Sequence, residues 1–258
     1  MILSLPLITW HEIYLGPITI QVWGLMVSLG FLVAIIIAAH EAKKRGLDDK
    51  KIYDLSVWII IGAFITARLF FLLEEPAYFA AHLIDIFKIW QGGLSITGGF
   101  LGAFLATIIY TRKKMISFWA YGESIVFALP AGICLGRIGC SLIHDHPGRE
   151  TDVPWGVDFN GTTRHEPAYY LVLNALLMFI FFLIMKRRPI AKKEGFFISA
   201  FMIWEGFSRF WLDFTRDPNV DTRIAGLTFA QYFSIFLFIG GITIAYKKLW
   251  KKNSTTTL

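Results

Sequence analysis

The chain alternates between long apolar runs and short polar or basic segments. Seven runs are long enough for a transmembrane helix, which needs about 20 consecutive apolar residues. The mean hydropathy of +0.56 agrees with this pattern. The sequence therefore predicts an all-α integral membrane protein, a single polytopic domain over residues 1–258 with seven transmembrane helices. These helices are expected at about 18–39, 52–73, 92–111, 117–140, 167–185, 195–215 and 227–246.

Three further segments complete the predicted layout. Residues 1–16 include Trp10 and Tyr14, aromatic residues of the kind that lie at membrane interfaces, and are expected to form a short interfacial helix. Residues 77–90 are too short to span and are expected to form an amphipathic helix on the outer face. The polar, turn-rich segment 144–166 is expected to be the longest external loop.

The basic residues indicate how the helices are oriented, because cytoplasmic loops are enriched in Lys and Arg. Of the 25 basic residues, 17 lie in alternate loops and in the C-terminal segment, and five lie on the opposite side. The N-terminus is therefore expected outside and the C-terminus in the cytoplasm. The net charge of +6 follows from this asymmetry and does not indicate nucleic-acid binding.

Three arginines lie within apolar spans: Arg68, Arg137 and Arg209. An arginine in the hydrocarbon layer costs roughly 2.5–3.5 kcal/mol on insertion scales, so it usually faces a cavity, a partner or a substrate. The three residues suggest one shared anion site. The alternative for each is a structural pair with a carboxylate, or a side chain that extends to the interface.

The outer ends of two spans carry the charges that favour such a site. Arg209 lies between Glu205 and Asp213 at intervals of four residues, so the three side chains share one helix face. Arg137 lies near the outer end of its own span, directly before the loop 144–166. Irregular polar backbone at this depth requires protein or a wet cavity around it. We therefore expect a pocket open to the outer leaflet that binds the phosphate of a lipid.

Glycine spacing predicts close helix packing around this pocket. Gly98 and Gly102 are four residues apart, as are Gly132 and Gly136. This spacing of small residues lets helix backbones approach one another. Packing alone explains these glycines, and contact with a ligand is the alternative.

Several motifs together resemble the prolipoprotein diacylglyceryl transferases, a family of bacterial membrane enzymes. The central motif is GRIGCSLIHDHPG at 136–148, followed by PWGV and RHEP. The other motifs occur in the order expected for the family and extend the likeness over nearly the whole chain. They are WGLMVSLGF at 23–31, ITARLFF at 65–71, QGGLSITGGFLGA at 91–103, GFSRFWLDFTRDP at 206–218 and GLTFAQ at 226–231.

The resemblance implies a seven-helix enzyme of the bacterial cytoplasmic (inner) membrane with its active site facing outward. The implied reaction transfers the diacylglyceryl group of phosphatidylglycerol to the lipobox cysteine of a prolipoprotein signal peptide, forms a thioether and releases glycerol-1-phosphate. No cofactor and no metal are implied, and a monomer is expected. Arg137 and Arg209 would stabilise the departing phosphate, and Asp145 and Asp213 would orient their guanidinium groups.

The chain departs from the family pattern at three positions. Thr97 stands where the family commonly has a histidine, Cys140 where an asparagine is expected and Trp23 where a tyrosine is expected. Because threonine is not a base near neutral pH, the proton of the incoming thiol needs another acceptor. The candidates are His144, His146 and His165, and our hypothesis is that the His144-Asp145-His146 triplet supplies the base.

Further residues are expected to contact the substrate, and two alternatives remain. The first alternative is a catalytically silent lipid-binding or lipid-transport protein on the same scaffold. The second reads His144, Asp145 and His146, together with His165, as metal ligands, although this spacing alone is a weak signal. The expected substrate-binding residues are Arg68, Trp23, Thr97, Gly98, Gly99, Cys140, Gly148, Arg216 and His165.

Overall fold

The computed structural model describes residues 5–74, 76–88, 93–219 and 223–251, apart from the side chains of residues 74, 77, 81, 87, 96 and 97. Among these residues, seven helices of 17 residues or more overlap the seven predicted spans. The predicted range coincides with that of α6 (Pro167–Met185), and the other predicted bounds differ from the observed ones by a few residues. The helices are α1 (Val22–Lys44), α2 (Lys50–Glu74), α4 (Ile96–Lys113), α5 (Phe118–Ile143), α6 (Pro167–Met185), α7 (Phe196–Leu212) and α8 (Phe229–Ala245).

Within the described part of the chain, five helices are long and apolar enough to cross a membrane: α1, α2, α5, α6, and α8 with its continuation η5 (Tyr246–Trp250). The other two are shorter and carry charges. Helix α7 has 17 residues, including Glu205 and Arg209. Helix α4 has 18 residues and ends in Arg112 and Lys113. Length and composition thus support a multi-pass membrane protein, with five rather than seven clear spans.

Short helical elements occupy the predicted amphipathic segment. Helix α3 (Pro76–Ala81) and the 3-10 helix η1 (Leu83–Phe87) replace the single helix expected over residues 77–90, whose last two residues lie outside the described part. Two further 3-10 helices follow α6 and α7. They are η3 (Pro189–Lys192) and η4 (Asp213–Thr215).

Three short antiparallel hairpins correct the expectation of a purely helical chain. The helix predicted over residues 1–16 is wrong for residues 5–16, the part that the structure describes, because residues 12–21 form a hairpin in which Glu12 pairs with Gln21. Its strands contain β-branched residues and Tyr14, which favour strands, and Gly16 turns the chain with φ +63°. The hairpins are β1 (Glu12–Leu15) with β2 (Ile18–Gln21), β3 (Val157–Phe159) with β4 (Thr162–Arg164), and β5 (Arg223–Ile224) with β6 (Leu227–Thr228).

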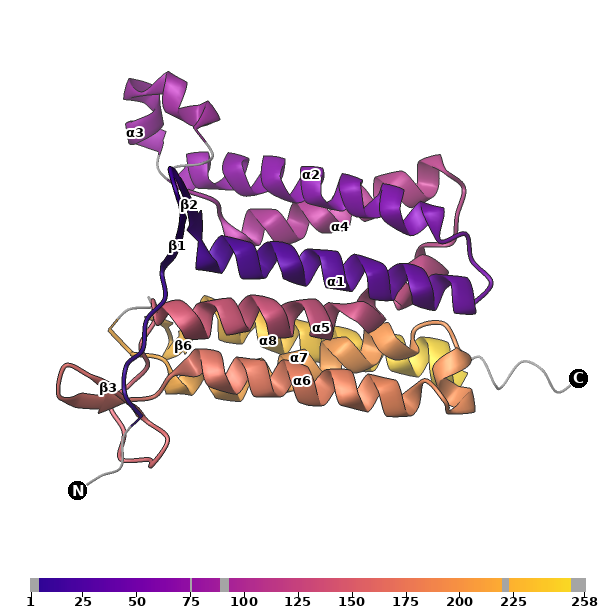
Figure 1. Cartoon of the computed structure of the whole chain (residues 1–258). Coiled ribbons are helices and arrows are strands. Elements are labelled where there is room, and N and C mark those ends of the chain that lie inside the picture. The colour runs from indigo at the N-terminus through magenta and orange to yellow at the C-terminus, as the bar shows by residue number, and fades with distance from the viewer. Residues whose placement is uncertain (1–4, 75, 89–92, 220–222, 252–258) are drawn as a thin grey trace, which may run out of the picture. The chain divides into compact units, whose positions relative to one another are not determined.

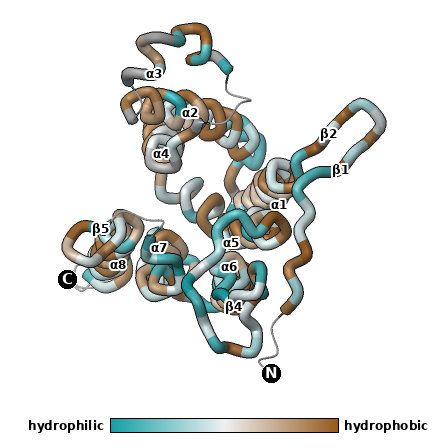
Figure 2. The backbone as a smooth tube through the Cα atoms, turned by 90° about the vertical axis from the view of Figure 1, so that its left-hand side faces the viewer, coloured by the Kyte–Doolittle hydropathy of each residue, from teal (hydrophilic) through white to brown (hydrophobic). Residues whose placement is uncertain are grey.

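The chain divides into two compact units, a smaller one (Ala39–Gly122) and a larger one (Met1–Ala38 with Glu123–Leu258). In the smaller unit, α2 and α4 lie side by side (Figures 1 and 2). A Cβ atom added at Gly98 would overlap the carbonyl group of Thr66, and one at Gly102 would overlap that of Gly62. The close packing predicted from the spacing of Gly98 and Gly102 is confirmed.

In the larger unit, α5, α6, α7 and α8 run alongside one another (Figure 1). Phenylalanine rings dominate its core, where Phe127, Phe182 and Phe197 are almost fully buried. Gly132 of α5 packs against α1, since a Cβ atom there would lie 2.8 Å from the carbonyl oxygen of Gly30. At Gly136 the nearest atom would be 3.9 Å away, so that glycine is not required by packing.

A buried carboxylate joins α5 to the start of α7. Glu123 has an exposed fraction of 0%. Its Oε1 accepts hydrogen bonds from the backbone N–H groups of Gly195 and Ile198, both at 3.1 Å, and its Oε2 accepts one from Phe197 at 2.9 Å. The first N–H groups of a helix have no partner inside the helix, and a carboxylate satisfies them well. Glu123 therefore caps α7 from a neighbouring helix.

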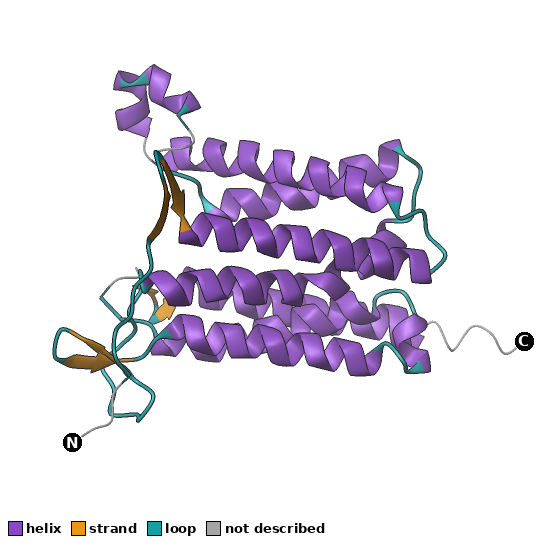
Figure 3. Ribbon diagram, in the orientation of Figure 1, coloured by secondary structure: helices purple, strands orange, loops and turns teal. Residues whose placement is uncertain are grey.

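The three hairpins lie at the same end of the larger unit's helices (Figure 3). The segment between α5 and α6 is largely hydrophilic, whereas the helices are largely hydrophobic (Figure 2). Leu5, near the start of the chain, also pairs with Val157 of β3. Polar chain segments are thus gathered at one end of the larger unit.

Candidate active site

Arginines from α5 and α7 lie within electrostatic range of each other in the larger unit. Arg209 interacts with Arg137, Asp213, Arg216 and Glu205. Glu205 in turn interacts with Arg137. We call these five residues the arginine cluster. It combines two of the three arginines found in the apolar spans with the charged face predicted for α7.

Asp213 is the most deeply buried member of the arginine cluster, with an exposed fraction of 1%. Its Oδ2 accepts a hydrogen bond from the hydroxyl group of Thr228, which also caps α8 by accepting from Gln231 N–H. Its Oδ1 lies 3.9 Å from Nη2 of Arg209 and 4.0 Å from Nη1 of Arg216. These distances exceed hydrogen-bond length, and Oδ1 has no hydrogen-bond partner among the described residues.

The guanidinium groups of Arg137 and Arg209 keep their donors available. Neither donates a hydrogen bond to another described residue, and the shortest ion pair of Arg209 is the 3.9 Å contact with Asp213. Three guanidinium and two carboxylate groups give the arginine cluster a net charge of about +1 when all are ionised. A half-buried cluster with one excess positive charge and unused donors is suited to a singly charged anion.

Arg68 has a different environment, in the smaller unit. Its exposed fraction is 8%. Its Nε donates to the carbonyl oxygen of Ile86 at 3.0 Å, its Nη1 to that of Gly93 at 2.8 Å, and its Nη2 to that of Asp85. The guanidinium group also lies 5.2 Å from the ring centre of Phe79. Arg68 therefore holds Asp85, Ile86 and Gly93 in place. This is the structural role considered as the alternative from the sequence, except that these partners are carbonyl groups and not a carboxylate.

The loop between α5 and α6 is fastened to the segment that follows α7. Gly148 N–H donates to His165 O at 2.8 Å, and Arg149 N–H donates to Thr215 O at 2.9 Å. A Cβ atom at Gly148 would lie 2.8 Å from His165 O, so the close approach requires glycine. Arg164 donates to Asp217 Oδ2 at 2.7 Å. Hydrogen bonds from Asn219 N–H and from Arg164 lower the pKa of Asp217.

His144 ends α5 and forms a buried pair with Glu166. Its φ of +49° reverses the chain, and its N–H donates to Cys140 O at 3.0 Å. The Nδ1 atom lies 2.6 Å from Oε2 of Glu166, and the two side chains are 3% and 2% exposed. Oε1 of Glu166 caps α6 by accepting from Ala168 N–H at 3.1 Å. Burial raises the pKa of Glu166, and the hydrogen bonds from His144 and Ala168 oppose that rise.

The other two members of the triplet are at the surface. Asp145 pairs with His146, with 2.8 Å between Oδ1 and Nδ1, and the side chains are 37% and 64% exposed. Among the described residues, Asp145 forms an ion pair with His146 alone. It forms none with Arg137 or Arg209, which it was expected to orient. The three residues of the triplet therefore differ in burial and in partners.

His165 belongs to a short hydrogen-bonded chain. Its Nδ1 lies 2.7 Å from the hydroxyl group of Tyr170, which accepts a hydrogen bond from Trp155 Nε1 at 2.9 Å. The tautomer of His165 sets the direction of its hydrogen bond with Tyr170, because a hydroxyl group can donate or accept. Burial, and next the charge of Arg149, lower the pKa of His165. Nδ1 of His165 is thus occupied by Tyr170, and the environment of the ring disfavours its charged form.

The remaining predicted substrate contacts are dispersed. Trp23 is half exposed at the start of α1, where its Cα atom faces Gly139 of α5. Cys140 is a free, half-buried thiol. Gly98 and Gly99 lie in α4, and the side chain of Thr97 lies outside the described residues. Substrate binding by these residues stays a prediction.

Three polar residues of the larger unit were not predicted as site residues: Glu205 of the arginine cluster, its partner Asn174, and Glu166. Trp204 Nε1 donates to Asn174 Oδ1 at 2.9 Å, and Asn174 Nδ2 donates to Glu205 Oε2 at 3.5 Å. Polar residues inside a span are rare enough to signal such a network. For Glu166, the signal is a carboxylate directly before a proline that begins a helix.

No group of three or more His, Cys, Asp or Glu side chains in the described ranges could hold a metal ion. This applies to the three histidines considered as ligands. His144, His146 and His165 have separate partners: Glu166, Asp145 and Tyr170.

Comparison with known proteins identifies the family. The family model for prolipoprotein diacylglyceryl transferase matches residues 11–247. The phosphatidylglycerol–prolipoprotein diacylglyceryl transferase of Geobacter sulfurreducens is 33% identical over 243 residues, which cover 90% of this chain and 92% of the relative. The enzyme of the same name from Nitrosomonas europaea is 32% identical over 245 residues, covering 91% and 87%. The chain therefore belongs to the prolipoprotein diacylglyceryl transferase family.

Proposed function

We propose that the chain transfers the diacylglyceryl group of phosphatidylglycerol to the lipobox cysteine of a prolipoprotein signal peptide. The thiol sulfur forms a bond to the glyceryl carbon while the bond from that carbon to the phosphate oxygen breaks. The products are a thioether and glycerol-1-phosphate, and the thiol proton passes to a base. The main support for this proposal is the arginine cluster, together with relatives that are named for this activity.

The charge of the arginine cluster fits this reaction. A phosphodiester carries one negative charge, and a phosphate monoester carries about −1.5 to −2 near neutral pH. Negative charge therefore grows on the phosphate as the carbon–oxygen bond breaks. Arg137 and Arg209, with donors not used by described residues, would bind the transition state more strongly than the bound lipid, which is the condition for catalysis. Asp213 would orient Arg209 and Arg216.

His144 is our candidate for the base. Its Nδ1 is occupied by Glu166, so Nε2 is the nitrogen that can accept the thiol proton, in the manner of an imidazole oriented by a carboxylate. His146 is exposed and pairs only with its neighbour Asp145 among the described residues. The buried pair favours His144 over His146 as the acting member of the triplet.

Replacing His144 with Gln is expected to lower kcat by about 10²-fold or more, the usual contribution of a positioned base. The variant His146→Gln serves as the matched control and is expected to stay close to the unmodified rate. The measurement is initial rate against pH for both variants, with thermal unfolding as a check on folding. Full activity of both variants would sink the assignment of the base to this triplet.

The membrane arrangement is also part of the proposal. We place the chain in the bacterial cytoplasmic membrane as a monomer with seven spans, α4 and α7 included. The basic loops would lie in the cytoplasm, and the end that carries the hairpins would face outward. In that case, the arginine cluster and the His144–Glu166 pair both approach the outer leaflet.

The test is an assay of the purified protein with phosphatidylglycerol and a lipobox peptide. We expect glycerol phosphate release and a peptide mass increase that matches one diacylglyceryl group. A peptide with serine in place of the lipobox cysteine should give neither product. Absence of release from a folded protein that still binds the lipid would favour the alternative, a catalytically silent lipid-binding protein.

A further inference from the structure

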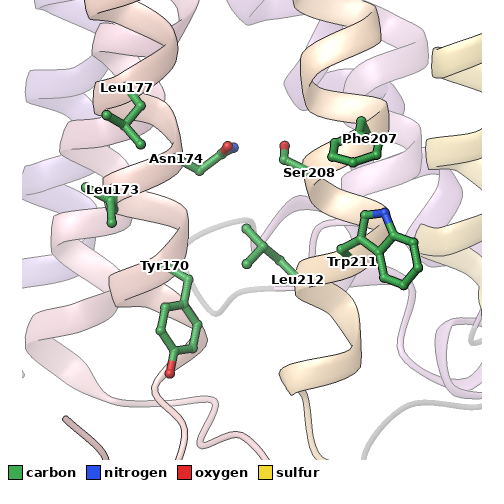
Figure 4. A pocket seen from close by; sticks show the side chains of 8 residues that line it. All are labelled: Tyr170, Leu173, Asn174, Leu177, Phe207, Ser208, Trp211 and Leu212. Atoms are coloured by element: carbon green, nitrogen blue, oxygen red, sulfur yellow. The ribbon is translucent and has the colours of Figure 1, made fainter.

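An open cavity lies between α6 and α7 in the larger unit (Figure 4). Its volume is about 490 Å³, within the range of about 300–1,000 Å³ that small ligands occupy. All of its lining residues are apolar or aromatic except Asn174 and Ser208. Helix α6 contributes one face, at intervals of three and four residues. This face consists of Tyr170, Leu173, Asn174 and Leu177.

The two polar residues of the cavity already have partners. Asn174 and Ser208 point toward each other from opposite helices (Figure 4). Asn174 is held by Trp204 and Glu205 through the hydrogen bonds described above. The Ser208 hydroxyl donates to Trp204 O at 2.8 Å. The cavity thus presents few unmet polar groups, and an apolar occupant fits it best.

The cavity and the arginine cluster are linked through α7 and through Asn174. Ser208 precedes Arg209 in the sequence, and Leu212 precedes Asp213. Asn174 connects the cavity wall to Glu205, which interacts with both Arg137 and Arg209. A molecule whose charged group binds the arginine cluster would therefore have the cavity between α6 and α7 next to its uncharged part.

We infer that this cavity holds one acyl chain of the phospholipid substrate. The inference rests on the proposed function for the identity of that lipid. A hydrophobic signal peptide is the competing occupant, but a helix is about 10–12 Å across and rises about 5.4 Å per turn. A volume of 490 Å³ would hold roughly one turn of it, whereas a narrow acyl chain can thread the same space.

Selection by this cavity depends on shape. Lipid tails are as apolar as leucine, so an acyl chain gains little by moving from the bilayer to an apolar protein surface. What the cavity adds is a fixed position for the chain and hence for the glyceryl carbon near the arginine cluster. Filling the cavity with a larger side chain should therefore weaken use of long-chain lipid specifically.

A labelling experiment tests occupancy without turnover. Phosphatidylglycerol with a photoreactive diazirine in one acyl chain is bound to the whole protein in the absence of peptide, irradiated and mapped by mass spectrometry. We expect labels concentrated within residues 170–177 and 207–212 and suppressed by excess phosphatidylglycerol. Uniform labelling of all lipid-facing helices, or labelling of these residues only by a photoreactive lipobox peptide, would overturn the inference.

Kinetics with filled cavities provide the second readout. Leu173→Trp and Leu177→Trp are expected to raise KM for long-chain phosphatidylglycerol roughly tenfold, the scale of a steric mismatch in an apolar pocket. KM for a short-chain phosphatidylglycerol and for the peptide should not change. Leu176→Trp, which is exposed and does not line the cavity, is the matched control.

The two readouts separate the inference from the proposed function. Labelling that concentrates in the cavity and is lost in Leu173→Trp supports the acyl-chain site even if the transfer assay fails. Conversely, an active enzyme whose labelling and KM values are the same in all three variants would retain the proposed function and refute the site.

Discussion

Arg137→Ala and Arg209→Ala are each expected to reduce the rate of diacylglyceryl transfer by about 10²–10³-fold or more. Removal of one positioned donor to a developing negative charge has an effect of this size. Here the removed group is also one of the positive charges that balance Glu205 and Asp213 in the arginine cluster. Without Arg137 or Arg209, the cluster has a net charge of about zero and loses its attraction for the growing charge of the phosphate.

Lysine variants separate charge from geometry. Arg137→Lys and Arg209→Lys keep the charge but lose the planar fork of donors that matches two phosphate oxygens. We expect rates between those of the alanine variants and the unmodified enzyme. The measurement is the initial rate of glycerol phosphate release at saturating lipid. Arg187→Ala, which removes an exposed arginine after α6, is the control. Alanine variants with the control's rate would contradict the assigned role.

Glu123→Ala is expected to lower the free energy of unfolding by about 3 kcal/mol. The substitution leaves the N–H groups of Gly195, Phe197 and Ile198 without their acceptor. Each buried donor left unsatisfied costs about 1–3 kcal/mol. A water molecule that enters the site and accepts from these N–H groups can restore part of the lost stability. Because α7 carries Arg209 and leads directly into Asp213, the same change is also expected to disturb the arginine cluster.

The two oxygens of Glu123 allow a graded test. Glu123→Gln retains Oε1, which accepts from two N–H groups, and replaces Oε2, which accepts from Phe197. We expect a smaller loss than for alanine, measured by unfolding in mixed detergent micelles. Glu194→Ala removes a half-exposed carboxylate that lies 3.9 Å from Lys248, and should change stability by less than about 0.5 kcal/mol. Equal stability of Glu123→Ala and Glu194→Ala would refute the capping role.

Apolar patterning was sufficient to locate the helices because a span needs an uninterrupted apolar run whatever it packs against. It did not reveal the hairpins. Residues 12–21 lie directly before α1, so the apolar run beginning at Ile18 was assigned to the span rather than to β2. Strands of two to four residues are too short for a clear alternating pattern.

The arginine cluster was partly predictable, because a charge within an apolar run has few explanations. Counting arginines identified Arg137 and Arg209 but also included Arg68, whose carbonyl partners come from a segment 17 to 25 residues away. The same count omitted carboxylates, so Glu123 was overlooked. The partner of His144 could not be predicted from spacing, since 22 residues separate it from Glu166.

The hydrogen bond between Asp213 and Thr228 links two positions whose evolutionary histories should be coupled. A glutamate at position 213 would carry the same charge on a side chain that is longer by one methylene group. Here one oxygen is fixed by a residue that also begins α8. A lineage that lengthens the acid must therefore shorten or displace its partner, so the two positions are expected to change together.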